Sequence, residues 1–208
     1  MAIVNGYLTI DEAVQYVGRN ETRDTTELED VVTSVSRLID RYCGRQFFQS
    51  TATARTFDSL NGTDVEFGPF NDVVSVTTLA YDSNDDGTFE TTVSASGYQL
   101  LPTKNTAPID EPFTSLRLLN GSTFPYAPAA SGRTGLIRIT GTYGWSAVPV
   151  EVKQAARIMV AEVAKLADAP LGVAGFGEFG VMRVSRSMPA RALQLLQPYR
   201  HPLNVGMA

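Results

Sequence analysis

The feature that most constrains the fold is a change of residue periodicity at two points along the chain. Helical spacing of apolar residues gives way to short runs rich in Val, Thr, Tyr and Phe, and helical spacing then returns. We therefore expect an α+β protein, with a helical bundle of two N-terminal helices and a long helix near 149–167, a β-rich insertion and an extended C-terminal arm. The corresponding parts of the chain are 1–50, 51–146, 147–170 and 171–208.

The N-terminal helices carry start and stop signals. Thr9 stands three residues before Glu12, which is the capping-box spacing in which each side chain satisfies an amide of the first turn. The second helix has N-cap candidates at Thr25 and its neighbours, and Gly44 suits a left-handed C-cap. The expected buried face of this helix follows the spacing i, i+3, i+4, i+7 and consists of Leu28, Val31, Val32, Val35, Leu38, Ile39 and Tyr42.

The long helix is apolar on two sides. Pro149 suits its beginning, and Pro170 ends the segment. One expected stripe consists of Val152, Ala155, Ala156, Met159, Val163, Leu166 and Ala167. The second side consists of Ile158, Val160, Ala161 and Ala164. Because a helix of this kind is usually buried on both sides, we expect the second set to form an interface with another chain.

Composition is that of an ordinary globular protein of 208 residues, with 43% hydrophobic and 19% charged residues. No run approaches the roughly 18 apolar residues of a membrane span, and the first residues do not resemble a secretory signal. The lone cysteine, Cys43, excludes an internal disulfide and fits a reducing compartment. We expect synthesis in a cytoplasm and no membrane partner.

The net charge of −5 is spread unevenly. Residues 51–146 hold ten acidic and five basic residues, whereas residues 171–208 hold one acidic residue and four arginines. An acidic body argues against a dedicated nucleic-acid binder, which needs clustered positive charge. The basic tail suits an acidic partner surface.

The stretch "DSNDDGTFE" (82–90) begins like a calcium loop. Asp82, Asn84 and Asp86 occupy loop positions 1, 3 and 5, and Gly87 occupies position 6. Position 12, however, is Val93 instead of glutamate, and a strand pattern follows. We interpret the stretch as the turn of a β-hairpin, with a weak calcium site on Asp82, Asn84 and Asp86 as the alternative.

Catalytic motifs are sparse. The glycines of "GFGEFG" (175–180) fit a phosphate-loop pattern, but a helix precedes them and "VMRVS" follows, so a hinge is the preferred interpretation. The only histidine, His201, lies in a tail expected to be mobile, and Cys43 suits a buried apolar position. We expect no enzymatic activity, no catalytic residue and no cofactor.

Four stretches in order resemble the head–tail connector, or adaptor, proteins of tailed phages. The main markers are a helix ending in "RYCGRQFF", and a strand ending in Tyr-Gly that precedes a Pro-initiated helix with "VKQAA". Cys43 departs from the small polar residue that members commonly carry there. The four stretches are 7–17, 37–48, 73–90 and 135–166, and the resemblance as a whole covers residues 7–167.

The resemblance implies a structural virion protein of the neck, assembled in the bacterial host cytoplasm. Members form a ring, typically of twelve copies, beneath the portal protein; the ring extends the DNA channel and docks the next neck protein, a stopper or tail protein. The charge of this chain agrees, because an acidic body around the channel would let DNA pass without sequence-specific binding. From its charge, the basic tail is expected to dock on an acidic portal surface through Arg183, Arg186, Arg191 and Arg200, with a solvated tail as the alternative.

Two other classes stay open. One is a different neck or tail-completion protein, which would bind on the tail side of the ring. The other is a β-rich ligand-binding module with the weak calcium loop, which calcium would stabilise.

Overall fold

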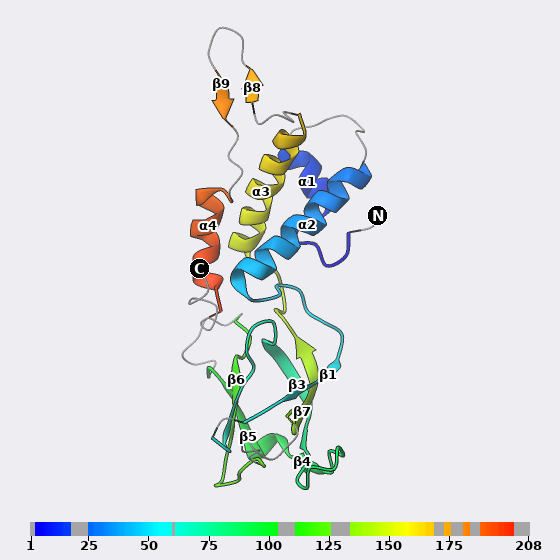
Figure 1. Ribbon diagram of the computed structural model, residues 1–208, viewed down its shortest axis with the longest axis vertical. Helices are drawn as coiled ribbons and strands as arrows, with labels where there is room; N and C mark the ends of the chain where they lie inside the picture. The colour runs from blue at the N-terminus through cyan, green and yellow to red at the C-terminus, as the bar shows by residue number, and fades with distance from the viewer. Residues whose placement is uncertain are drawn as a thin grey trace. The chain divides into compact units, whose positions relative to one another are not determined.

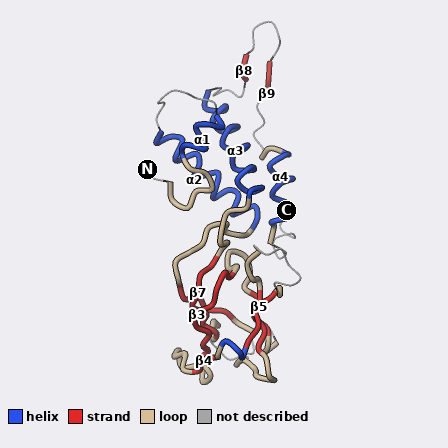
Figure 2. Tube along the Cα trace, turned by 180° about the vertical axis from the view of Figure 1, so that it is seen from behind, coloured by secondary structure: helices blue, strands red, loops and turns tan. Residues whose placement is uncertain are grey.

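The computed structural model describes two compact units. The helical unit combines Met1–Gly44 with Val148–Ala208, and the β unit is Arg45–Ala147. All α-helices of the described residues belong to the helical unit (Figures 1 and 2). The fold is therefore mixed α+β. The described residues are 3–17, 25–59, 61–103, 111–125, 134–168, 173–175, 181–183 and 188–201.

Helices dominate the helical unit. They are α1 (Ile10–Val17), α2 (Thr25–Cys43), α3 (Val150–Asp168) and α4 (Ala190–Leu196), with the short 3-10 turn η3 (Gln197–Tyr199) after α4. Helix α3 contacts each of the other three, and α1 also contacts α2. Strand β8 (Val173–Gly175) pairs antiparallel with β9 (Val181–Arg183). Within the described ranges, no helix combines the length and apolarity needed to cross a membrane.

The helix ends follow the local signals. The Thr9 N–H donates to Glu12 Oε2 at 3.0 Å, and the Glu12 N–H donates to Thr9 Oγ1 at 3.2 Å, which confirms the capping box. Gly44 has a φ of 66°, and its N–H donates to the Asp40 carbonyl oxygen at 2.8 Å, so α2 ends in the predicted left-handed cap. These features depend on neighbouring residues alone, which is why periodicity and spacing predict them.

Polar contacts connect the segment before α1 to α2, and most of the groups involved are buried. The Tyr7 hydroxyl donates to Asp40 Oδ1, and Arg37 Nε lies 3.1 Å from Asp40 Oδ2. The Tyr7 N–H donates to Ser36 Oγ at 3.1 Å. Burial raises the pKa of Asp40, and the contacts from Tyr7 and Arg37 oppose that rise.

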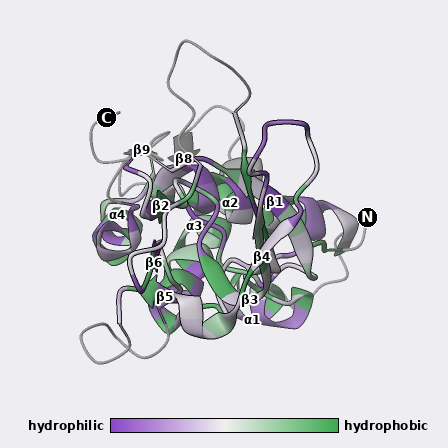
Figure 3. Ribbon diagram, turned by 90° about the horizontal axis from the view of Figure 1, so that it is seen from below, coloured by the Kyte–Doolittle hydropathy of each residue, from purple (hydrophilic) through white to green (hydrophobic). Residues whose placement is uncertain are grey.

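Residues 188–201 correct the expectation of an extended C-terminal arm. Helix α4 packs on α3, and its Ala192 and Leu196 side chains are fully buried. His201, expected in a mobile tail, is 4% exposed, and its N–H donates to the Cys43 carbonyl oxygen at 2.7 Å. Figure 3 shows hydrophilic and hydrophobic residues together on α4, as in an amphipathic helix packed on a core. This segment is therefore part of the helical unit.

The β unit contains two antiparallel sheets. One has the strand order β1-β7-β3-β4, and the other has the order β2-β6-β5. The strands are β1 (Thr53–Phe57), β2 (Asp64–Glu66), β3 (Val73–Tyr81), β4 (Thr91–Val93), β5 (Tyr98–Leu101), β6 (Ser115–Leu118) and β7 (Ile137–Tyr143), and the 3-10 turn η1 (Ala95–Gly97) precedes β5.

The core of the β unit collects the inward-facing residues of both sheets. Along β7, Ile137, Ile139 and Tyr143 are buried while Arg138 is exposed, which is the alternation of a sheet with one covered face. The Tyr143 hydroxyl donates to the Ile139 carbonyl oxygen at 2.7 Å. The whole core cluster consists of Phe57, Val65, Phe67, Val73, Leu79, Leu116, Leu118, Phe124, Ile137, Ile139 and Tyr143.

Candidate functional site

The acidic loop connects the paired strands β3 and β4, so the hairpin expected from the sequence is present. Carboxylate oxygens of Asp82, Asp86 and Glu90 lie within 4.8 Å of one another, a grouping that can hold a metal ion. Asp82 is buried, whereas Asp86 and Glu90 are exposed. Sequence reasoning missed Glu90, which stands at loop position 9, where calcium loops often coordinate through water.

The same carboxylates already accept hydrogen bonds within the loop. Asp82 Oδ2 accepts the Gly87 N–H at 2.6 Å, and Asp82 Oδ1 accepts the Asn84 and Asp86 N–H groups at 3.2 and 3.3 Å. Glu90 Oε1 accepts from the N–H and hydroxyl of Ser83. These Ser83 hydrogen bonds lower the pKa of Glu90. The carboxylates therefore organise the turn, which is the role that Asp and Asn commonly have in turns.

A second polar cluster lies at the end of β7. Arg45 Nη1 lies 3.3 Å from Asp72 Oδ2, and both side chains are buried. Trp145 is 3% exposed, packs against Phe47 at a centroid distance of 5.3 Å, and has Arg45 over its ring. Burial raises the pKa of Asp72 to about 6, against the opposing charge of Arg45.

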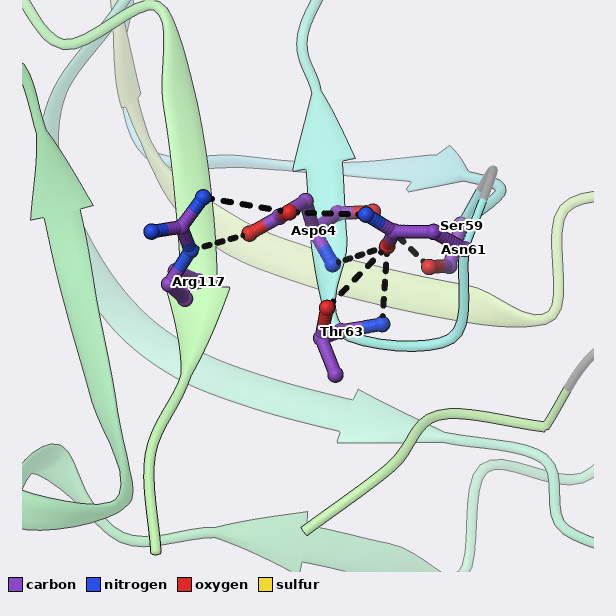
Figure 4. Close-up of polar contacts among 5 residues, drawn as sticks. All are labelled: Ser59, Asn61, Thr63, Asp64 and Arg117. Atoms are coloured by element: carbon purple, nitrogen blue, oxygen red, sulfur yellow. Dashed lines mark hydrogen bonds and ion pairs between the residues drawn. The ribbon is translucent and has the colours of Figure 1, made fainter. Parts of the chain in front are cut away.

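An exposed ion pair joins β2 to β6 (Figure 4). Arg117 Nε lies 2.6 Å from Asp64 Oδ1, and Arg117 Nη2 lies 3.3 Å from Asp64 Oδ2, a two-point contact between directly paired residues. Asn61 Nδ2 donates to Asp64 Oδ2 at 2.8 Å, and Asn61 Oδ1 accepts the N–H groups of Thr63 and Asp64. The Arg117 contact lowers the pKa of Asp64. This cross-strand pair fixes strand register.

The candidate interface residues of α3 divide into two groups. Val160 and Ala164 are buried, at 1% and 7% exposure, within the chain's own helical unit. Ile158 and Ala161 are partly exposed. Val163, expected in the buried stripe, is 37% exposed, and Leu38 of α2 is 43% exposed, so both burial predictions are wrong.

The four candidate docking arginines also have different surroundings. Arg191 is exposed at the start of α4, and its Nη1 donates to Gln194 Oε1 at 3.3 Å. Arg200 is partly buried and lies over the Tyr42 ring at 5.2 Å. Arg183 ends β9, and Arg186 lies outside the described residues.

The remaining candidates from the sequence are Cys43 and the glycines of the phosphate-loop pattern. Cys43 is fully buried at the end of α2. Gly175 ends β8, which pairs with a strand, whereas a phosphate loop leads into a helix. Gly177 and Gly180 of the same pattern lie outside the described residues.

Sequence reasoning also missed Phe70. The Gly-Pro pair at 68–69 marks a turn, but a phenylalanine after it does not suggest a surface role. The structure places Phe70 at 41% exposure with a φ of 63°. A large apolar side chain in this backbone conformation is uncommon and warrants a functional explanation.

Solved structures share this fold. A chain from the neck of an empty GTA (gene transfer agent) particle, computed with C6 symmetry, has a TM-score of 0.57 and 19% identity over 96% of this chain and 92% of that chain. A chain from the virion of a native particle has a TM-score of 0.57 and 20% identity over the same shares. A chain from the native neck, computed with C12 symmetry, has a TM-score of 0.55 and 19% identity, again over 96% and 92%.

These likenesses establish a common fold along nearly the whole chain. No protein-family model matches the sequence, and no curated protein matches it. The fold is therefore a mixed α+β fold that also occurs in chains from the necks of gene transfer agent particles.

Proposed function

We propose that this chain is a structural head-to-tail adaptor that forms a ring beneath a portal protein. The observation that carries the proposal is the fold shared over 96% of the chain with components of necks computed with C6 and C12 symmetry. The sequence resemblance to phage adaptors supports the same role. A ring of twelve copies would extend the DNA channel and dock a stopper or tail protein. The role is non-enzymatic and places the chain in the virion neck.

The outward side of α3 supplies a subunit-packing face. Val150 is 75% exposed, and Ile158 and Ala161 are partly exposed. The spacing of these three residues, eight and three positions, places them on one side of a helix. Apolar residues on that side can pack against the neighbouring subunit, whereas Val160 and Ala164 hold α3 within its own chain.

Charge supports passage of DNA without adhesion. The chain has a net charge of −5, and residues 51–146 carry twice as many acidic as basic residues. Negative walls around a channel repel phosphates, so a passing duplex would not be retained. The arginine-rich C-terminal segment would instead face an acidic surface of the portal.

The test of the proposed function is sedimentation velocity of the chain alone and mixed with the portal protein of the same particle. Co-sedimentation at one fixed stoichiometry supports the adaptor role, even if the chain alone is a monomer. Binding to the tail-side partner without any binding to the portal would contradict it and would identify a tail-completion protein.

Arginine substitutions separate docking from folding. Because Arg191 is exposed, Arg191→Ala should weaken portal binding several-fold, with greater loss at low salt, and leave the melting temperature unchanged. Arg200→Ala removes a contact with Tyr42 and should lower the melting temperature. Equal portal affinity of the wild type and of the fourfold alanine variant of Arg183, Arg186, Arg191 and Arg200 would refute arginine docking.

A further inference from the structure

The turn between β2 and β3 has an unusual residue at its most restrictive position. The Asn71 N–H donates to the Gly68 carbonyl oxygen at 3.3 Å, which closes a four-residue turn with Pro69 and Phe70 at its centre. Phe70 has a φ of 63°. Proline followed by a positive φ characterises a type II turn, and that second central position is normally glycine or asparagine. Phenylalanine there costs free energy that glycine would not.

Neighbouring groups hold the turn in this conformation. Arg55 Nη1, from β1, donates to the Phe70 carbonyl oxygen at 2.7 Å and to Asn71 Oδ1 at 2.8 Å. Asn71 Nδ2 donates to the Pro69 carbonyl oxygen at 3.1 Å. The Arg55 guanidinium lies over the ring of the buried Tyr143 at 4.1 Å, which fixes the arginine in turn. The turn is therefore rigid, and its backbone is held by contacts that do not involve the Phe70 ring.

The Phe70 side chain is much more exposed than the other phenylalanines around it. It is 41% exposed, whereas Phe57 and Phe67 of the same unit are 8% and 2% exposed in the core. A rigid backbone that presents an exposed aromatic ring is pre-organised for a contact, because little conformational entropy is lost on binding. Aromatic residues of this kind dominate the binding energy of protein interfaces.

We infer that Phe70 anchors the contact between neighbouring copies of this chain, a conclusion that rests on the proposed ring. In cyclic rings each copy presents one surface to the next copy and a different surface to the previous one. Among the described residues, the other large apolar side chains with comparable exposure all belong to the helical unit. They are Val4, Tyr16, Leu38, Val150 and Val163. The Phe70 ring of one copy therefore packs against the helical unit of the next.

The test exploits the opposite effects expected on folding and on assembly. Phe70→Gly relieves the positive φ, so the monomer should unfold at the same temperature or a few degrees higher. The same variant should self-associate at least about tenfold more weakly in sedimentation equilibrium, alone or on the portal, because the anchor is lost. Phe70→Tyr keeps the ring and should assemble like the wild type.

A matched control carries the same backbone change without an apolar side chain. Asn120 is exposed in the same unit with a φ of 59°, so Asn120→Gly should leave assembly unchanged.

Two outcomes would overturn the inference and leave the proposed function intact. In one, Phe70→Gly assembles into normal rings that bind their partners normally. In the other, its rings are normal but bind the portal or the tail protein more weakly. A large fall in melting temperature would also overturn it, by showing that the side chain supports its own fold. A wild type that stays monomeric even with the portal would overturn both.

Discussion

The buried Asp72 carboxylate makes folding stability depend on pH. Its pKa is raised to about 6 from 3.8, so the folded state binds its proton more tightly than the unfolded state does. The stability from this group is present below pH 3.8 and is lost as pH rises through 6. The charged groups that act on Asp72 are Arg45, which opposes the rise, and Glu111, which adds to it.

Asp72→Asn should remove this dependence. Between pH 4 and pH 7.5 the wild type should lose about 2 kcal/mol of unfolding free energy relative to the variant, because only the wild type must give up the Asp72 proton. Urea unfolding at both pH values measures it, and the comparison cancels the other carboxylates because they are common to both proteins. A difference that does not change with pH would contradict the assignment.

Gly144 occupies a position after β7 that other residues cannot fill. Its φ is 96°, its N–H donates to the Asp72 carbonyl oxygen at 2.8 Å, and an added Cβ would overlap the Phe48 carbonyl oxygen. Gly144→Ala should therefore destabilise the protein by more than about 2 kcal/mol. Gly121→Ala is the control, because Gly121 has a φ of 71° with open space at the Cβ position. Equal losses in urea unfolding would show that backbone strain alone matters.

Residue-scale predictions from the sequence succeeded where the cause is local. The Thr9–Glu12 capping box and the Gly44 cap depend on residues within one turn, and both are present. Leu38 and Val163 continue helical stripes but are exposed. Periodicity gives the side of a helix on which a residue lies. Whether that residue is buried depends on how far the neighbouring elements extend over that side, and helical spacing carries no information about their extent.

At the scale of elements, α4 shows why the sequence of the C-terminal segment predicts an arm although the segment packs on α3. The run "PARALQLLQPY" indicates a short helix, but seven helical residues give too little periodicity to show that the helix packs on a core, and the flanking prolines suggest an irregular chain. What places α4 is contact with α3, which is distant in sequence, and the burial of Ala192 and Leu196. Packing with remote residues overrides weak local signals.

Leu196→Ala tests whether α4 belongs to the core. Because Leu196 is fully buried, the substitution should cost about 2–5 kcal/mol of unfolding free energy, measured by urea denaturation. Leu195→Ala, at a partly exposed neighbouring position, should cost less. Wild-type stability of Leu196→Ala would mean that the segment does not contribute to the fold in solution.

At the scale of the whole molecule, the order of helical and β segments predicted a mixed α+β fold. The candidate surfaces were harder to predict. Ile158 and Ala161 are partly exposed whereas Val160 is buried, and this difference depends on how α1, α2 and α4 pack around α3. The exposed Phe70 turn could not be found at all, because its positive φ is one that glycine, not phenylalanine, normally signals.

The most direct test of the central claim is an electron cryomicroscopy reconstruction of the chain bound to its portal protein. We predict a closed ring of twelve copies seated on the portal, with the outward side of α3 and the Phe70 turn at the contacts between copies. A chain bound as isolated copies, or a ring found only on the tail side of another neck protein, would contradict the adaptor role.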